Sequence, residues 1–336
     1  MQKLGALLLF MILLSCGEEG DSQQIKPEHY FTGNADVNTQ TEFGIVLMGG
    51  ADANTIAEQM SFKFLVEKSG GGDFVVLRSS GSDGYNDYIF EDIGGVNSVT
   101  TLVIRSKEDA NNSFVTQTVK NAEAVFIAGG DQSNYVNYWA DSELQEALNF
   151  VLNDKKIPIG GTSAGLAVLG GYYYGALSDG IISSEALANP YHPNMEGLTN
   201  EPLIKADFLS EVITDSHYSA RGRQGRHFAF MARLMKDNQL SKVYGIGVDE
   251  ATAAIIDNKG KARIFGNGDV YFLKGSSQPE VCENNQSLTW DHDGKAVEAL
   301  IVNGTFDGAN TFDLVSWTTS DADMTYWSAK EGEFFD

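Results

Sequence analysis

One serine, Ser163, lies in a pattern that could make it a nucleophile. It is the centre of Gly161-Thr162-Ser163-Ala164-Gly165, between the apolar run 157–159 and the small-residue run 166–169. Glycines on both sides of a serine permit the tight strand-to-helix turn that exposes its hydroxyl group. The N–H of Ala164 would then face the oxyanion of a tetrahedral intermediate. The pattern indicates acyl-transfer chemistry, although a plain Gly/Ser loop can carry the same residues.

A nucleophilic serine needs a base, and His217 is the best placed of five histidines. It follows the strand-like run 211–214 in Asp215-Ser216-His217, so it should lie at the carboxyl end of a strand. The serine turn opens at the same kind of edge, which is why we pair His217 with Ser163. The other four lie in polar segments, a loop and a helical stretch: His29, His192, His227 and His292.

Two further groups could contact a substrate. The turn Gly129-Gly130-Asp131-Gln132 closes the apolar run 124–128, so Gly130 could supply a second oxyanion donor and Gln132 a substrate hydrogen bond. The same turn could also serve only to start a helix at Ser133. Three arginines follow the candidate base: Arg221, Arg223 and Arg226. Guanidinium groups bind carboxylates in a bidentate manner, so they could form a clamp, or they could simply pair with nearby acids.

The elements that must position these residues have an alternating pattern. Short apolar runs at 44–48, 74–77, 101–104 and 124–128 are typical of parallel strands buried on both faces. Helix-like segments, such as 55–66 and 106–120, separate them. The alternation predicts an α/β fold, a flavodoxin-like open parallel sheet with helices on both faces. The runs 243–248, 253–256, 262–265 and 270–273 are joined by short turns and predict an antiparallel β extension on this sheet.

The N-terminus indicates export. Residues 1–15 form a short basic start followed by an apolar run too short to span a bilayer, as in a signal peptide. That run ends in Leu14-Ser15-Cys16-Gly17, which resembles the lipobox of bacterial lipoproteins, so we expect a lipid anchor at Cys16 on an outer-membrane surface. We interpret 16–42 as an acidic tether, 43–275 as the catalytic domain and 276–336 as an acidic, turn-rich extension without catalytic pattern.

The whole-chain charge excludes some partners. The formal net charge is −23, from 23 basic and 46 acidic side chains. Such a surface repels nucleic acid and anionic lipid, so we expect membrane contact only through the anchor. No pattern predicts a metal or another cofactor. The choice between a monomer and a homodimer stays open.

Four motifs in order resemble the cyanophycinases, which share a serine-peptidase family with dipeptidase E. They are Gly-Gly-Asp-Gln, Gly-Thr-Ser-Ala-Gly, the segment from Asp215 to Arg226, and Gly245-x-Gly247-x-Asp249-Glu250. The resemblance covers about residues 43–275. It implies a glutamine-amidotransferase-like α/β fold and a Ser–His–acid triad that cleaves peptide bonds at aspartyl residues, which in cyanophycin are β-aspartyl–arginine links.

The resemblance also implies roles for single residues. Ser163 and His217 match the nucleophile and the base. For the acid, the spacing after Ser163 favours Glu185 over Asp179. The family's substrate pocket maps onto Gln132, Asp215, Arg221, Arg223 and Arg226. Two departures, Ser216 where cyanophycinases have Gln and a longer stretch at 172–209, leave the substrate open between cyanophycin and another isoaspartyl or acidic peptide. An α-aspartyl dipeptidase and a catalytically silent peptide- or glycan-binding lipoprotein are the alternatives.

Overall fold

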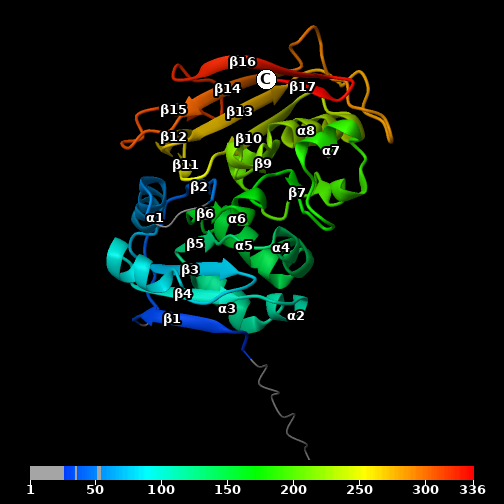
Figure 1. The fold of residues 1–336 in the computed structure, drawn as a ribbon. Coiled ribbons are helices and arrows are strands. Elements are labelled where there is room, and N and C mark those ends of the chain that lie inside the picture. The colour runs from blue at the N-terminus through cyan, green and yellow to red at the C-terminus, as the bar shows by residue number, and fades with distance from the viewer. Residues whose placement is uncertain (1–25, 35, 51–53) are drawn as a thin grey trace, which may run out of the picture.

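A computed structural model describes residues 26–34, 36–50 and 54–336 (Figure 1). Its larger sheet has nine strands in the order β1-β4-β3-β5-β6-β2-β11-β12-β15. Strands β4, β3, β5, β6 and β2 are parallel, and the strands outside them are antiparallel to their neighbours. In sheet order the strands are His29–Gly33, Ser98–Val103, Asp73–Arg78, Ala124–Ile127, Ile159–Thr162, Ile45–Met48, Thr252–Ile256, Lys261–Gly266 and Thr311–Asp313. The predicted α/β class and its parallel core are confirmed.

Helices cover both faces of the parallel core because alternate strand residues point to opposite sides. In β2, Ile45 and Leu47 join the core that packs under α3, α4 and α5, whereas Val46 and Met48 join the core under α1. These four helices are α1 (Ile56–Lys68), α3 (Ser113–Asn121), α4 (Gln132–Trp139) and α5 (Glu143–Asn153). The short helices are α2 (Lys107–Ala110), α6 (Ala164–Ala167) and α7 (Ser183–Ala188), and a π-helix covers Tyr88–Ile93.

A second sheet lies at the end of the molecule opposite β1 (Figure 1). Its order is β17-β16-β14-β13-β10-β9, and only the pair β9–β10 is parallel. In that order the strands are Glu333–Phe335, Asp323–Lys330, Val297–Asn303, Asp269–Gly275, Val243–Val248 and Val212–Asp215. Helix α8 (Gln224–Asn238) packs on one face, and the other face meets the first sheet, where Phe272 stacks on Phe312 with ring centroids 3.6 Å apart. The longer stretch 172–209, which we call the insertion or the inserted stretch, adds a small antiparallel pair, β7 (Tyr173–Tyr174) with β8 (Leu198–Thr199).

Three features of the fold differ from the sequence-based expectations. The predicted β extension is divided, because β11 and β12 join the first sheet while β10 and β13 join the second. The segment predicted as a tether contains β1, an edge strand whose side chains are exposed or half-buried, so it lacks the apolar alternation of an ordinary strand. The C-terminal extension contributes β14 to β17 and pairs with both sheets. Cys16 and the predicted signal peptide lie outside the described residues.

Candidate active site

The serine turn has the strained geometry that its sequence predicts. Ser163 follows β6 directly, with φ 55° and ψ −117°, and α6 begins at the next residue. A Cβ atom on Gly161 would lie 2.4 Å from the Gly165 carbonyl carbon, and one on Gly165 would lie 2.1 Å from the Ile127 oxygen. Only glycine therefore fits at positions 161 and 165. The sheet and α6 together hold Ser163 at backbone dihedral angles that non-glycine residues avoid.

The structure brings His217 to Ser163. The Ser163 Oγ and His217 Nε2 atoms lie 2.7 Å apart, although 54 residues separate them in the chain. Gly49 and Gly50, which follow β2, both contact His217. The His217 N–H donates to the Gly49 carbonyl oxygen at 2.7 Å, and the ring lies directly against Gly50. Both residues follow strand ends, as expected, but not on one sheet edge, because Ser163 follows β6 of the nine-stranded sheet and His217 follows β9 of the six-stranded sheet.

The carboxylate that contacts His217 belongs to Glu250. Its Oε1 atom lies 2.6 Å from His217 Nδ1, so Ser163, His217 and Glu250 form a continuous hydrogen-bonded row. Glu250 follows β10 by two residues, as His217 follows the neighbouring parallel strand β9. The Asp249 carboxylate fixes this arrangement by accepting the Ser219 N–H at 2.7 Å and the Asp269 N–H at 3.1 Å.

The position assigned to Glu185 is corrected by this geometry. Glu185 lies in the first turn of α7, where its carboxylate accepts the Ile182 N–H at 3.3 Å and serves as a helix cap. Asp179 lies in an exposed loop before that helix. No interaction found in the described residues joins either carboxylate to His217. Sequence distance after Ser163 is a poor guide, because the insertion carries Glu185 into α7, which packs against α8. The acid beside His217 is instead in the fourth motif, whose Glu250 was left without a role.

Burial and charge keep the imidazole neutral near pH 7. Burial lowers the pKa of His217, the hydrogen bond to Glu250 opposes this change, and the cations Arg221 and Arg223 lower the pKa further. The net pKa is below the ordinary value of 6.5. A neutral imidazole whose Nδ1 is bonded to a carboxylate carries its proton on Nδ1, so Nε2 is free to accept the proton of Ser163.

Two backbone groups frame the space beside the serine hydroxyl. Ala164 is the first residue of α6, so its N–H has no acceptor within that helix. A Cβ on Gly129 would lie 3.3 Å from Ser163 Cβ, and Gly130 follows in an extended conformation with φ 158°. Ala164 is therefore adjacent to Ser163, the contact across the sheet is made by Gly129, and the predicted donor Gly130 is the next residue of that turn.

Gln132 takes a place at the edge of the site. It is the first residue of α4, and its side-chain amide donates to the Tyr174 carbonyl oxygen of the inserted stretch. Asp131 caps the helix by accepting the Ser133 N–H at 3.0 Å. The turn does start a helix, one residue earlier than expected, and Gln132 also joins the insertion to the turn beside Ser163.

The three arginines differ in their surroundings, because Arg226 is buried and Arg221 is exposed. Arg226 binds the buried Asp215 through two hydrogen bonds of 2.8 and 2.7 Å, and its third goes to the Ile181 carbonyl oxygen. Burial would raise the pKa of Asp215, but Arg226 and Arg223 outweigh it and lower the pKa to about 2. Arg223 also donates to the Ser216 carbonyl oxygen at 2.7 Å. Arg221 is exposed, and no carboxylate partner for it is found among the described residues.

These contacts correct part of the predicted substrate pocket. Asp215 and Arg226 already satisfy one another in the interior, so neither is available to a substrate as a free charge. The geometry leaves Arg221, and in part Arg223, as the cations that a carboxylate of a ligand could reach.

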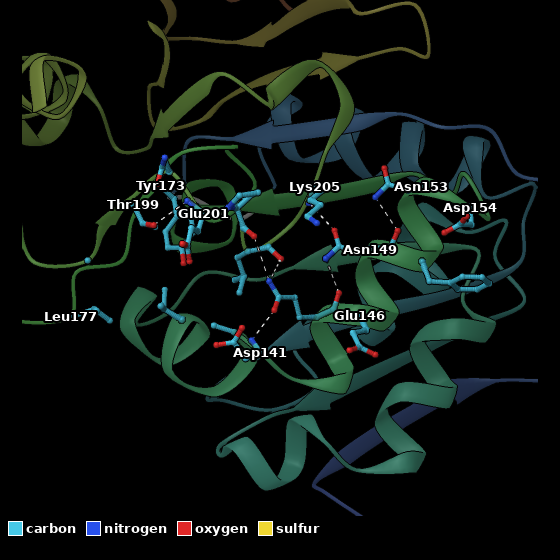
Figure 2. Close-up of a pocket in the computed structure, with 18 residues that line it drawn as sticks. Asp141, Glu146, Asn149, Asn153, Asp154, Tyr173, Leu177, Thr199, Glu201 and Lys205 are labelled. Atoms are coloured by element: carbon cyan, nitrogen blue, oxygen red, sulfur yellow. Dashed lines mark hydrogen bonds between the residues drawn. The ribbon is translucent and has the colours of Figure 1, made fainter. Parts of the chain in front are cut away.

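The inserted stretch has two different surroundings. Tyr174 and Ile181 lie next to the candidate site, through Gln132 and Arg226. The segment 197–205 instead faces α4 and α5 across a groove of about 890 Å³ (Figure 2). The Lys205 N–H donates to the Asn149 side chain at 2.8 Å at the floor of this groove. Tyr173 and Leu177 of the first half of the insertion line this groove too, and none of Ser163, His217 and Glu250 does.

Comparisons with known proteins identify the family of this chain. The sequence model of peptidase family S51 matches residues 87–264, a range that includes Ser163, His217 and Glu250. The chain belongs to peptidase family S51. A cyanophycinase from Trichormus variabilis is 26% identical over 255 residues, which cover 73% of this chain and 79% of that protein. A cyanophycinase from Synechococcus elongatus is 29% identical, covering 67% and 66%.

Among solved structures, a peptidase from an acI-B1 Actinobacterium is similar with a TM-score of 0.47 and 17% identity, covering 69% of this chain and 91% of that one. Family membership and the cyanophycinase relatives make this chain a serine-type peptidase. The family resemblance read from the four motifs is confirmed.

Proposed function

We propose that the chain hydrolyses peptide bonds at aspartyl residues, with the β-aspartyl–arginine links of cyanophycin or a related isoaspartyl peptide as its substrate. The observation that carries the proposal is the row from Ser163 through His217 to Glu250, with contacts of 2.7 and 2.6 Å. The relatives named cyanophycinase support the choice of substrate class. Arg221 lies beside the row, is exposed and has no ion-pair partner in the described part of the chain, which supports a substrate that carries a carboxylate.

In the proposed mechanism, Ser163 attacks the scissile carbonyl while His217 Nε2 takes its proton. Glu250 holds the imidazole in the correct tautomer and stabilises the imidazolium that forms. The N–H groups of Ala164 and Gly130 stabilise the oxyanion. His217 then protonates the leaving amine, which breaks the peptide bond and leaves an acyl ester on Ser163. Water, deprotonated by His217, hydrolyses that ester and returns the free serine.

A panel of four substrates tests the proposal. Purified protein is given cyanophycin, β-Asp-Arg, α-Asp-Arg and β-Asp-Leu, and release of free amino groups is measured, with Ser163→Ala as the control. We expect cleavage of the β-linked compounds and loss of about 10⁴-fold or more in the Ser163→Ala protein. Cleavage of α-Asp-Arg alone would replace the proposal with an α-aspartyl dipeptidase. No cleavage of any compound, together with no reaction with a fluorophosphonate probe, would favour a silent binding protein.

We further propose that Cys16 carries the lipid that holds the enzyme on the outer membrane, facing the periplasm or the cell surface. The support is the lipobox-like Leu14-Ser15-Cys16-Gly17 after an apolar run. Cys16→Ser should move the protein from the membrane fraction to a soluble exported fraction, since stable anchoring depends on the acyl chains. Cys282→Ser is the matched control, because Cys282 is buried and cannot be lipidated in the folded chain. Membrane retention of Cys16→Ser would require another anchor.

A further inference from the structure

The loop after β3 lies on the same sheet edge as the catalytic serine. Leu77 pairs with Ile127, and Ile127 pairs with Gly161. Two residues further along these three strands come Ser79, Gly129 and Ser163, so they form a row across the edge. Adjacent strands are about 4.8 Å apart, which puts the Ser79 backbone roughly 10 Å from that of Ser163. The side chains of Ser163 and Ser79 extend from these backbones and shorten the gap, so that one β-linked aspartyl residue between them can bridge it.

Arg78 gives this loop an unneutralised positive charge. Its guanidinium donates to the Ser80 carbonyl oxygen and, at 2.5 Å, to the Ser82 carbonyl oxygen. It lies so close over Gly81 that a Cβ there would be 2.2 Å from Nη2. No ion pair of Arg78 is found in the described part of the chain, although acidic side chains outnumber basic ones 46 to 23. The loop therefore holds the guanidinium in place without cancelling its charge.

Ser79, the residue after Arg78, adds a buried hydroxyl group that faces the turn beside Ser163. Its side chain is buried, with 4% exposed, and within residues 26–34, 36–50 and 54–336 its Oγ has no hydrogen-bond partner. The Ser79 Oγ lies 3.7 Å from the position a Cβ on Gly130 would take, so it faces the turn beside Ser163. The adjacent Tyr135 hydroxyl already donates to the Ala128 and Gly129 carbonyl oxygens. A buried polar group left without a partner costs free energy, and a ligand atom can supply that partner.

The position of the base decides which part of a substrate this loop would meet. His217 must protonate the leaving amine, so the leaving group lies on its side of Ser163, towards Gly50 and Arg221. In the sheet order, β2 lies on one side of β6, and the glycines that follow β2 contact His217, whereas β5 and then β3 lie on the other side. The residue that supplies the scissile carbonyl therefore extends over Gly129–Gly130 towards β3.

We propose that Arg78 and Ser79 form a carboxylate subsite for the residue on the acyl side of the scissile bond. In a β-linked aspartyl substrate this group is the free α-carboxylate of that aspartate. Arg78 supplies the charge and Ser79 a hydroxyl donor, in the way that guanidinium and hydroxyl groups commonly share one carboxylate. The proposal rests on the proposed function and adds to it the group that selects the acyl residue.

The kinetic test compares a β-aspartyl dipeptide with the same peptide whose α-carboxylate is blocked as an amide. We expect the wild-type protein to prefer the free carboxylate by about 10- to 100-fold in kcat/KM, the scale of a charge-assisted hydrogen bond. Arg78→Gln should remove most of this preference, Arg78→Lys should keep part of it, and Ser79→Ala should weaken it. Arg263→Gln is the matched control, because Arg263 also donates to two backbone carbonyl oxygens, Gly308 and Asp307, in a different part of the sheet.

A binding test separates this inference from the proposed function. L-aspartate is titrated calorimetrically into the Ser163→Ala protein with and without Arg78→Gln, so no turnover is needed. Aspartate binding that weakens at least about tenfold with Arg78→Gln supports the subsite even if no β-aspartyl peptide is cleaved. Unchanged aspartate affinity, or no binding in either protein, overturns it. So do equal kinetic losses on the carboxylate and amide peptides, because Arg78 would then only shape its loop.

Discussion

The Nδ1 atom of His217 lies 2.6 Å from the Oε1 atom of Glu250, at the adjacent ends of the parallel strands β9 and β10. The contact depends on small residues in β10. A Cβ on Gly247 would lie 2.5 Å from the ring of Tyr218, and one on Gly245 would lie 2.9 Å from Nε2 of His227. These close approaches let β10 pack against the segment that carries His217. The glycines of the fourth motif therefore have a structural role, and its glutamate has a chemical one.

Glu250→Gln should lower kcat by about 10³- to 10⁴-fold, because the amide cannot hold the imidazole tautomer or stabilise the imidazolium. Glu185→Gln and Asp179→Asn are the matched controls and should change kcat by less than about threefold, since their carboxylates do not contact His217 in this structure. Steady-state kinetics on one β-aspartyl peptide compares all three. A large loss in Glu185→Gln with a small one in Glu250→Gln would reverse the assignment.

The pH dependence of kcat/KM should separate the charges around His217. Its pKa is lowered by burial and by Arg221 and Arg223, and raised by Glu250. Activity needs the neutral imidazole, so the acid limb of the profile should fall below pH 6.5. Arg221→Gln removes a cation that opposes protonation, so the limb should move to higher pH. Glu250→Gln removes an anion that favours protonation, so the limb of its residual activity should move to lower pH. Shifts in the same direction would contradict this account.

Much of the fold could be predicted from the sequence because its signals are local. The run before Ser163, the glycines around it and the short apolar strands each carry a pattern within a few residues. His217 was found by the same rule, since it follows a strand end. Glu250 also follows a strand end by two residues, but distance along the chain from Ser163 was preferred to this shared edge. Pairing across the sheet, rather than spacing, decides which acid meets the histidine.

The arginines show where sequence reasoning had too little information. Arg221, Arg223 and Arg226 are equivalent as a pattern, and only the packing of α8 buries Arg226 against Asp215. The edge strand β1 and the C-terminal strands were missed for a related reason. Their stability comes from partners distant in sequence, β4 for the first and β12 and β13 for the second, and their own residues show little alternation.

Substitutions in this cluster should separate a structural arginine from a surface one. Arg226→Gln leaves Asp215 buried beside a weaker partner, so the free energy of unfolding should fall by about 3–5 kcal/mol. Arg221→Gln removes an exposed charge and should change that free energy by less than about 0.5 kcal/mol. Urea unfolding at pH 7 measures both. Equal, small effects on the free energy of unfolding would mean that Arg226 does not form the ion pair with Asp215 in solution.

The last prediction concerns the glycine on which the base rests. A Cβ on Gly50 would lie 2.4 Å from Cε1 and 2.5 Å from Nε2 of His217, and Gly50 has φ +104°, which alanine adopts only with strain. In Gly50→Ala the imidazole must therefore move, and the 2.7 Å contact with Ser163 Oγ cannot persist. Since Ser163 and His217 act as a unit, we expect kcat/KM to fall by about 10³-fold or more.

Gly84→Ala is the control for this change, because no atom lies within 4 Å of the new Cβ and its backbone is not left-handed. It should leave both activity and stability unchanged. The readout is the second-order rate of labelling of Ser163 by a fluorophosphonate, which needs the base but no bound peptide. Gly50→Ala should label far more slowly than the wild-type protein while remaining folded by circular dichroism. Labelling at the wild-type rate would mean that the alanine Cβ is accommodated without moving His217. The contacts of Gly49 and Gly50 with His217 would then not fix the position of the base.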